Sequence, residues 1–452
     1  MNRNVFIIGM DSYNLATLQG LREAHRYSFH GLLPLPQVLK ADAYDYEQLL
    51  HDADQQLLAC EHSVDALVTW WDFPSSGLVP TLTELWDLPG PDLSSIVALE
   101  HKYWSRLEQR AAAADHVPPF AAFDPFDDDA LDGIHRDGLG FPFWVKPVKS
   151  VGSYLGFRIE NLEDFEEAMI RTRAGIAQLG DPFQQVMDRV DLPPPVRHAG
   201  ALTCLAEGII GGQQCTVEGY VSNGRVVTYG VIDSITHEDS SSFRGYQYPS
   251  RLSTPIQRRV RDIAADVIGH VGLDHCCFNV EFFYDEVAGR IWLLEVNTRA
   301  SQSHCDLFAK VDGASSQRAM LDVAQSRTPR MPYRRGDHQV AGKLYLRTDQ
   351  DGLVRAVPDH EAIRAVQERF PGTRVDLAVE VGTHLSDLNI QDSYTYELGH
   401  ASVGADSHTQ LDERFDQITT MLPFDIERGR PGRADGPRDR GPVAAPAPDV
   451  AP

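Results

Sequence analysis

The fold of this chain is decided by two apolar strands and the turn between them, Phe278-Asn279-Val280-Glu281-Phe282-Phe283-Tyr284, Asp285-Glu286-Val287-Ala288-Gly289 and Arg290-Ile291-Trp292-Leu293-Leu294-Glu295-Val296-Asn297-Thr298-Arg299. Side chains alternate between the two faces of a strand, so Glu295 and Asn297 share a face. A hairpin that turns at Val287 and Ala288 places Glu281 opposite Glu295, or nearly so. Two carboxylates and an amide oxygen are then expected on one patch of an otherwise apolar sheet.

This patch carries a concentration of negative charge. Buried like charges repel, and burying them is costly unless a positive group joins them. Oxygen ligands suit a hard divalent cation such as Mg²⁺ or Mn²⁺. Arg299, one strand step beyond Asn297, adds a fixed positive charge suited to phosphate or carboxylate. For any single glutamate the alternative is an exposed hairpin with a solvated carboxylate, but the whole set predicts a cation site.

The composition bounds the class of protein. The chain has 452 residues, enough for two or three domains, and 42% apolar with 23% charged residues is typical of a globular protein. The net charge of −24 argues against a nucleic acid or an anionic membrane surface as the main partner. It leaves room for a local basic pocket that binds nucleotide phosphates. No stretch approaches the roughly 20 apolar residues of a membrane-spanning helix.

The amino terminus and the cysteines bear on localisation. Residues 5–8 are too short an apolar run for a secretory signal and predict a first strand instead. The six cysteines are scattered, and none forms a C-x-x-C pair with zinc spacing. We therefore expect reduced thiols in a cytoplasmic protein.

The first hundred residues alternate between strand and helix patterns. Strands are expected at residues 5–9 and 64–70, and helices at residues 14–26 and 77–85. This alternation predicts a small parallel sheet with helices on both faces. The loop after the first strand lacks the G-x-G-x-x-G pattern, which argues against an NAD site.

The rest of the chain mixes both kinds of element. Helices are expected at residues 101–114, 162–179, 254–271 and 361–369, and strands at 141–147, within 202–230, and at 340–346, 375–380 and 393–398. Irregular segments are expected at 181–200 and 240–253. The segment from Gly429, rich in Pro, Gly, Arg and Ala, cannot form a core and is expected to be disordered.

Two lysines are candidates for binding phosphates. Lys146 lies on a strand directly before a loop that contains Gly152 and Gly156, where backbone N–H groups and an ammonium could contact phosphate oxygens. Lys102 lies at the start of the helix expected at residues 101–114. Taken alone, either lysine is better explained as an ordinary strand end or an exposed helix position.

An apolar strand that runs into a glycine-rich link is a further candidate. Its residues Glu207-Gly208-Ile209-Ile210 can offer backbone groups to an adenine edge, and Gln214 could reach ribose hydroxyls. The alternative is a connector between two sheets, which this segment by itself favours. The polar and aromatic loop that contains Arg244 is equally compatible with substrate contacts and with a solvated surface.

In their order along the chain, these pieces resemble an ATP-grasp enzyme over about residues 1–425. The resemblance implies an α/β fold with an N-terminal parallel-sheet pre-grasp domain, a lid subdomain and a central antiparallel-sheet core. The implied domains are a pre-grasp domain at residues 1–100, an ATP-grasp domain at 101–335 with a lid at about 117–202, a C-terminal α+β subdomain at 336–427 and a tail at 428–452.

The resemblance also implies roles for individual residues. Glu281, Glu295 and Asn297 match the metal ligands, and Arg299 matches the active-site arginine. Glu218 matches a recurrent acidic strand position. The implied ATP contacts are the two lysines, the glycine loop and the hinge, namely Lys102, Lys146, Ser153, Glu207, Gly208, Ile209, Ile210 and Gln214. Further candidate substrate contacts are Glu218, Arg244, Ser303 and His304.

Departures from the family pattern narrow the implied reaction. Many members have a ribose-binding acid where Gln214 stands. Biotin carboxylases are similar up to Arg299 but have an acidic residue where Ser303 stands, and no Met-Lys biotin-attachment motif occurs in this chain. The segment Tyr396-Glu397-Leu398-Gly399-His400-Ala401 is more similar to the carboxylate–amine ligases that join amino acids.

The resemblance thus implies an ATP-dependent carboxylate–amine ligase that forms an acyl-phosphate, joins it to an amine and releases ADP and phosphate. The implied cofactors are ATP and Mg²⁺ or Mn²⁺, and the implied partners are small-molecule acids and amines. Homodimers are common among similar enzymes. The alternatives are a non-catalytic ATP-binding regulatory protein of the same fold, an acid–thiol ligase and a carboxylase. No motif identifies the acid or the amine.

Overall fold

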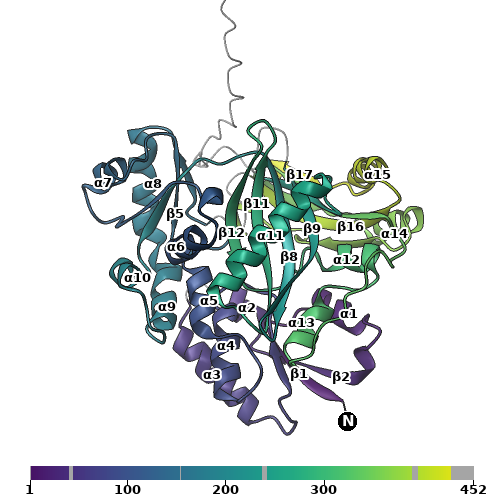
Figure 1. Cartoon of the computed structure of the whole chain (residues 1–452). Helices are drawn as coiled ribbons and strands as arrows, with labels where there is room; N and C mark the ends of the chain where they lie inside the picture. Colours follow the sequence, from purple (N-terminus) through teal and green to yellow (C-terminus); the bar gives the residue numbers. More distant parts are fainter. Residues whose placement is uncertain (1, 40–43, 153, 237–241, 389–394, 429–452) are drawn as a thin grey trace, which may run out of the picture. The chain divides into compact units, whose positions relative to one another are not determined.

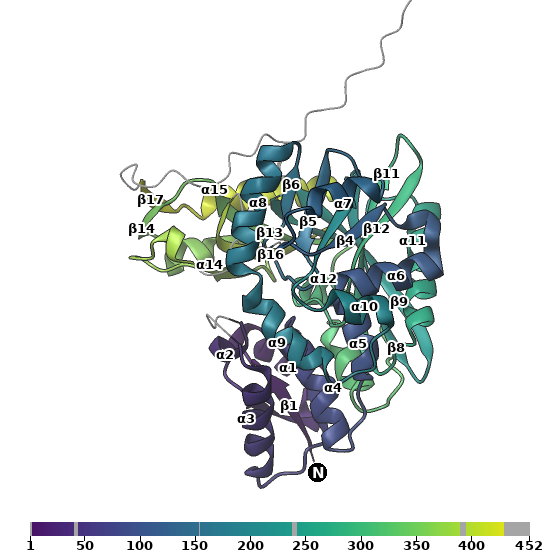
Figure 2. The same cartoon turned by 90° about the vertical axis from the view of Figure 1, so that its left-hand side faces the viewer.

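The structure is a computed structural model that describes residues 2–39, 44–152, 154–236, 242–388 and 395–428. The chain divides into two compact units. The first comprises Met1–Asp233 and Tyr248–Gln339, and the second comprises Ser234–Gln247 and Val340–Pro452. Figures 1 and 2 show the elements of each unit. The tail that we expect to be disordered, from Gly429, lies outside the described residues.

The first unit begins with a parallel sheet of three strands in the order β2-β1-β3. The predicted parallel sheet is therefore confirmed. The central strand is β1, whose residues Val5 and Ile7 are fully buried. The strands are β1 (Arg3–Ile8), β2 (Tyr27–Leu32) and β3 (Ala66–Val68), and the helices of this region are α1 (Ser12–Gln19), α2 (Leu35–Leu39), α3 (Tyr46–Leu58), α4 (Ser75–Leu85) and α5 (Leu93–Glu100).

The helix expected at residues 14–26 is wrong in its extent. α1 ends at Gln19, and the N–H of Gly20 caps it by bonding to the carbonyl of Ala16. The chain then turns and enters β2 at Tyr27. β2 has little apolar pattern and was not predicted, because its strand state comes from its pairing with β1. α3 and α5 also lack a counterpart among the predicted helices.

The region expected to form the lid contains an antiparallel sheet in the order β4-β7-β5-β6. α6 (Lys102–Ala113) leads into this sheet and matches the helix predicted at 101–114 to within one residue. The strands are β4 (Phe120–Phe123), β5 (Phe143–Pro147), β6 (Phe157–Ile159) and β7 (Cys204–Gly208), and the helices are α7 (Ala130–Arg136), α8 (Leu162–Gly175), α9 (Ala177–Met187) and α10 (Pro194–Ala199).

The irregular segment expected at residues 181–200 is wrong. α9 continues to Met187, and α10 follows it. α9 remains helical although Pro182 lies inside it, because Phe183 and Val186 are buried in the same apolar cluster as residues of α3. Tertiary packing here outweighs the local cost of proline.

The central sheet of the first unit contains neighbouring antiparallel strands in the order β12-β11-β8-β9. The expected antiparallel core is therefore confirmed. α11 (Thr254–Val271) has the predicted bounds and lies across this sheet, where Val260 and Ala264 join Phe278 and Val280 in one core (Figure 1). The strands are β8 (Gln213–Ser222), β9 (Arg225–Thr236), β11 (Cys276–Asp285) and β12 (Arg290–Asn297), and α12 (Cys305–Asp312) and α13 (Gln317–Val323) follow.

The hairpin of β11 and β12 contains a β-bulge. On the turn side Phe282 faces Leu293, and on the other side Glu281 faces Glu295. Leu294 is therefore an extra residue on β12 that has no partner in the register. Without this extra residue Glu281 would face Leu294, because the register shifts by one position at this point.

The bulge also changes the phase of β12. Ile291 and Leu293 are fully buried, and the next buried residue is Val296, three positions later instead of two. A shift of one residue moves every following side chain to the other face of a strand. Glu295 would otherwise point to the apolar core. The predicted opposition of Glu281 and Glu295 is confirmed, and the bulge is its cause.

The second unit has a sheet in the order β10-β13-β16-β15 and its own apolar core, which includes Leu344, Val403 and Phe415. The loop expected at residues 240–253 is wrong in part, because β10 forms within it. Gly245 allows the close approach of the Lys343 backbone to β10. The elements are β10 (Phe243–Tyr248), β13 (Val340–Thr348), β14 (Gly352–Ala356), α14 (His360–Arg369), β15 (Arg374–Leu377), β16 (Tyr396–Ala405), α15 (His408–Met421) and β17 (Asp425–Arg428).

We expect Phe278→Ala to lower the free energy of unfolding by about 3–5 kcal/mol, the usual cost of emptying a buried aromatic site. Phe278 is 0% exposed in the core between α11 and the central sheet. Urea unfolding followed by tryptophan fluorescence measures the change. The control is Val287→Ala, because Val287 is 100% exposed in the hairpin turn. Equal midpoints for the two variants would contradict the place of Phe278 in the core.

Candidate nucleotide site

A floor of acidic and amide side chains is formed by β11 and β12. Glu281 faces Glu295 in the register, and Asn279 faces Asn297 two residues along. Asn297 Nδ2 donates to Glu281 Oε1 at 3.2 Å and to Asn279 Oδ1 at 2.9 Å. Gln214 Nε2, on β8, donates to Glu281 Oε2 at 3.1 Å. Amide nitrogens thus hold the Glu281 carboxylate in place.

The two glutamates of this floor differ in their affinity for a proton. Burial and the neighbouring carboxylate of Glu295 raise the pKa of Glu281 to about 7. Burial also acts against the ionisation of Glu295, but the ammonium groups of Lys102 and Lys146 outweigh it and lower the pKa of Glu295. The cations of the protein therefore compensate one carboxylate and leave the other largely uncompensated.

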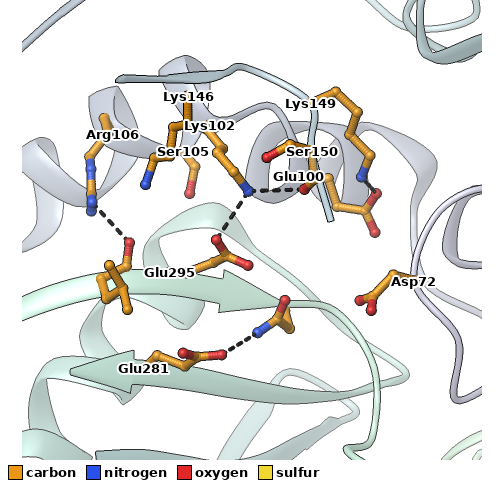
Figure 3. Close-up of polar contacts among 12 residues, drawn as sticks. Asp72, Glu100, Lys102, Ser105, Arg106, Lys146, Lys149, Ser150, Glu281 and Glu295 are labelled. Atoms are coloured by element: carbon orange, nitrogen blue, oxygen red, sulfur yellow. Dashed lines mark hydrogen bonds and ion pairs between the residues drawn. The ribbon is translucent and has the colours of Figure 1, made fainter. Parts of the chain in front are cut away.

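Two lysines from different elements approach the floor (Figure 3). Lys102 begins α6, and its Nζ donates to Glu295 Oε2 at 3.0 Å and to the carbonyl of Ser150 at 3.3 Å. Lys146 lies on β5 and pairs with Glu207 Oε2 at 2.5 Å. Burial lowers the pKa of Lys146, and the charge of Glu207 opposes this shift. The fold thus brings both predicted lysines to the carboxylates of one region.

Glu207, near the end of β7, is held by two cations. Its buried carboxylate pairs with Arg106 of α6 and with Lys146 of β5. Burial alone would raise the pKa of Glu207, but these cations lower it to about 2. In the sheet, Glu207 lies between Phe120 of β4 and Trp144 of β5. Its side chain therefore anchors the lid sheet.

The predicted adenine hinge continues beyond this anchored residue. Gly208 ends β7, and Ile209 and Ile210 follow outside any strand. Ile209 is 39% exposed, so it offers an apolar surface of the kind that a flat ring can cover. Gln214, which we predict to reach a ribose, donates to the Glu281 carboxylate.

Arg299 follows β12 and forms a two-point ion pair with Asp72. Arg299 Nε donates to Asp72 Oδ1 at 2.7 Å, and Nη2 donates to Oδ2 at 3.0 Å. Burial tends to lower the pKa of Arg299, but the Asp72 carboxylate raises it, so the guanidinium stays charged. Asp72 follows β3, at the carboxyl edge of the parallel sheet, where open α/β sheets bind their ligands.

A second ion pair connects the glycine loop to the end of β12. Lys149 Nζ pairs with Glu100 Oε2 at 2.5 Å, and both side chains are more than nine-tenths buried. Glu100 Oε1 accepts a hydrogen bond from Thr298 Oγ1 at 3.0 Å. The loop after β5 is thereby joined to the residue that precedes Arg299.

The remaining residues that we predict to contact ATP or a substrate do not share one environment. Glu218 is fully buried, and its Oε1 lies 2.7 Å from Nδ1 of the buried His304. Ser303 is half-buried next to it in the chain. Arg244 belongs to the second unit, where its Nη2 pairs with a carboxylate of α15 at 2.8 Å. Ser153 lies outside the described residues.

Four charged residues of this region were not predicted from the sequence: Asp72, Glu100, Arg106 and Lys149. Two of them carry a signal that could have been used. Asp72 closely follows a buried strand of a predicted parallel sheet, the position at which such sheets place functional side chains. Arg106 lies four residues after Lys102, so the two side chains share one face of α6.

The chemistry of the floor suits a hard divalent cation. Glu281 and Glu295 offer carboxylate oxygens and Asn297 offers an amide oxygen, which are the ligands that Mg²⁺ prefers. The pKa of Glu281 is raised by burial and because ionisation places a second negative charge beside Glu295, and a bound cation would compensate this charge. Within the described part of the chain, no three His, Cys, Asp or Glu side chains are grouped closely enough to hold a metal ion. The floor itself offers two carboxylates and the amide of Asn297.

A parallel sheet, an antiparallel lid sheet and a central antiparallel sheet that carries an acidic floor define a protein of the ATP-grasp fold. Residues 139–306 match the family described as the ATP-grasp domain. The chain therefore contains an ATP-grasp domain, which these residues form. No protein in a search of curated sequences matches it.

Solved structures of the same fold match nearly the whole chain. The L-amino acid ligase from Bacillus licheniformis is 16% identical, with a TM-score of 0.70 over 94% of this chain and 99% of that one. The biotin carboxylase from Campylobacter jejuni, in complex with β-γ-ATP, is 14% identical, with a TM-score of 0.64 over 93% and 92%. The N5-carboxyaminoimidazole ribonucleotide synthetase from Thermotoga maritima is 14% identical, with a TM-score of 0.62 over 94% and 100%.

Glu207→Gln should destabilise the protein by about 3–5 kcal/mol near pH 6, the cost of removing one partner from a buried ion pair. Because the folded pKa of Glu207, about 2, lies below its ordinary value, its stabilising effect is complete above about pH 4.5. This effect is lost as the pH falls from about 4.5 towards 2. The difference in unfolding free energy between wild type and variant should therefore shrink between pH 6 and pH 3.

Urea unfolding at pH 6, 4 and 3 measures this difference. Glu160→Gln is the control, because Glu160 forms an exposed ion pair with Arg158 and exposed pairs contribute little. A difference for Glu207→Gln that stays constant down to pH 3 would contradict the depressed pKa.

Proposed function

We propose that the protein is an ATP-dependent ligase that joins a carboxylate to an amine. The observation that carries this proposal is the approach of Lys102 to the acidic floor of Glu281 and Glu295, with Arg299 directly beyond the same strand. Positive groups on one side and carboxylates on the other form the arrangement that a metal-bound triphosphate needs. The match of residues 139–306 to the ATP-grasp domain supports the same ligand.

The residues are suited to phosphoryl transfer, which needs positioning and charge neutralisation more than covalent catalysis. Lys102 and Lys146 would hold the phosphates of ATP from the side of α6 and β5. Glu281, Glu295 and Asn297 would hold Mg²⁺, which neutralises charge on the phosphate oxygens when bound. Burial lowers the pKa of Lys146, and the Glu207 carboxylate at 2.5 Å acts against this shift in favour of the ammonium.

Arg299 would act on the substrate that receives the phosphoryl group. A guanidinium has two edges, and Asp72 occupies the one formed by Nε and Nη2. The other edge can bind the substrate carboxylate, then the acyl-phosphate and the oxyanion that forms when the amine attacks. Closure of the lid at about residues 117–202 would exclude water from the acyl-phosphate, which water would otherwise hydrolyse.

The acceptor is proposed to be an amine. Ser303 stands where biotin carboxylases have an acidic residue, which favours amide formation over carboxylation. The L-amino acid ligase from Bacillus licheniformis covers 94% of this chain with a TM-score of 0.70, which is in line with this acceptor. Ser303, Glu218 and His304 are the proposed substrate contacts.

The location and assembly of the protein belong to the same proposal. Within the described residues, no helix has both the length and the apolar character needed to cross a bilayer. We propose a cytoplasmic protein with small-molecule substrates, and a homodimer as its assembly.

We expect ADP to be released only when a suitable acid and amine are both present. The experiment incubates the protein with ATP, Mg²⁺ and pairs of amino acids and small amines, measures ADP with a coupled assay and identifies the product by mass spectrometry. An amide product with one ADP per bond supports the ligase. ATP binding without turnover over the whole panel would favour a regulatory protein, and a thioester product would favour an acid–thiol ligase.

Glu295→Gln should lower the rate of ADP release by at least about 100-fold, because it removes a ligand charge and the partner of Lys102 while keeping the shape of the side chain. Glu286→Gln is the matched control, since Glu286 is an exposed glutamate in the turn of the same hairpin. Thermal unfolding should show both variants folded. Wild-type turnover in a folded Glu295→Gln variant would disprove the role of Glu295 in holding the metal.

A further inference from the structure

Arg106 is a buried arginine whose partners are Gln109 on its own helix and groups on two other elements. Only 2% of its surface is exposed, so its charge and donors need partners inside the protein. Its Nε donates to the Glu207 carboxylate. Its Nη1 donates to the carbonyl of Leu293 at 3.1 Å, and its Nη2 donates to the carbonyl of Leu294 at 2.8 Å. Figure 3 shows the side chain pointing from α6 towards β12.

The two carbonyls belong to the β-bulge that places Glu295. Leu294 is the extra residue of β12, and Leu293 and Glu295 are its neighbours. At a bulge the ladder is interrupted, so backbone groups lose their regular partners. A carbonyl that is shielded from water and has no partner destabilises the fold. Arg106 supplies that partner with a charge-assisted hydrogen bond, which is stronger than a neutral one.

We propose that Arg106 is a positioning residue for the metal ligands of the site. It stabilises the bulge at Leu294, and the bulge turns Glu295 and Asn297 onto the face that carries Glu281. The inference deepens the proposed function, on which its catalytic part depends. Arg106 itself contacts neither the floor carboxylates nor any group proposed to react.

The same guanidinium connects the floor to the lid sheet. Nε pairs with Glu207, which also holds Lys146 at 2.5 Å. Arg106 lies four residues after Lys102 on α6, and Lys102 Nζ lies 3.0 Å from the Glu295 carboxylate. Arg106 thus connects three elements: β12, which carries the proposed metal ligands, β7, which precedes the hinge, and α6, which carries Lys102. A lysine cannot replace it, because a single ammonium has no planar fork to reach the Glu207 carboxylate and both carbonyls.

The test compares Arg106→Lys with Arg110→Lys, a matched change on the same helix at an exposed arginine. Hydrogen exchange of the ligand-free proteins, read on a peptide that covers residues 290–297, reports the bulge without any assay of activity. We expect faster exchange of this peptide in Arg106→Lys only. Arg106→Gln is made in parallel, so that the comparison survives if one of the two variants at this position does not fold.

The affinity for Mg²⁺ is measured by calorimetry at a saturating concentration of ADP. For Arg106→Lys we expect the Kd for Mg²⁺ to rise by about 10-fold or more, the range found when residues that orient metal ligands are changed. kcat should fall by a similar factor, and by more than the KM for ATP rises, because the metal ligands are misplaced while Lys102 and Lys146 keep their own contacts with Glu295 and Glu207. Arg110→Lys should match wild type in all of these measurements.

A folded Arg106→Lys protein with wild-type exchange at residues 290–297 and a wild-type Kd for Mg²⁺ would overturn the inference, and Arg106 would then be only a core ion-pair partner. A lower melting temperature with unchanged Mg²⁺ affinity leads to the same conclusion. Failure of wild type to bind Mg²⁺ and ADP would instead overturn the proposed function, and the exchange experiment would still decide whether Arg106 holds the bulge.

Discussion

The site depends on two glutamates that are held directly opposite each other on neighbouring strands. Glu281 and Glu295 repel, and burial and this repulsion raise the pKa of Glu281 to about 7. The surrounding cations offset this cost in part: Lys102 pairs with Glu295, and Arg106 binds the carbonyl of the preceding residue. The remaining uncompensated charge is the reason why we propose a cation at this part of the sheet.

Three charge pairs join elements of the first unit to one another. Glu207 joins α6 to the lid sheet, Glu100 joins the loop after β5 to the end of β12, and Asp72 joins the parallel sheet to Arg299. Each pair has at least one partner that is mostly buried, and breaking a buried pair is far more costly than breaking an exposed one. The junctions therefore fix the relative positions of the groups that we propose to bind ATP, while the apolar clusters supply the bulk of the stability.

Much of this arrangement could be predicted where local pattern and tertiary structure agree. The parallel sheet, α6 and α11 followed from alternation and helical periodicity, and the hairpin followed from its two apolar strands. Predictions failed where long-range packing decides the local state. β2 is a strand because it pairs with β1, and α9 is a helix because Phe183 and Val186 are buried. The environments of Glu218 and His304, which pair with each other, also depend on the fold.

By itself the sequence determined which side chains can form the site, because Glu281, Glu295, Asn297 and Arg299 lie at fixed spacings on two strands joined by a short turn. It also determined that these two strands pair, since their apolar residues must be buried together. Only the tertiary structure decided that Glu281 and Glu295 face each other. Plain alternation about the turn pairs Glu281 with Leu294, and the bulge that corrects this is held by an arginine from a helix almost 190 positions earlier in the chain. The alternation of side chains along a strand is a local property. The hydrogen-bond donor for a carbonyl at a bulge, in contrast, can come from any part of the chain that the fold brings close.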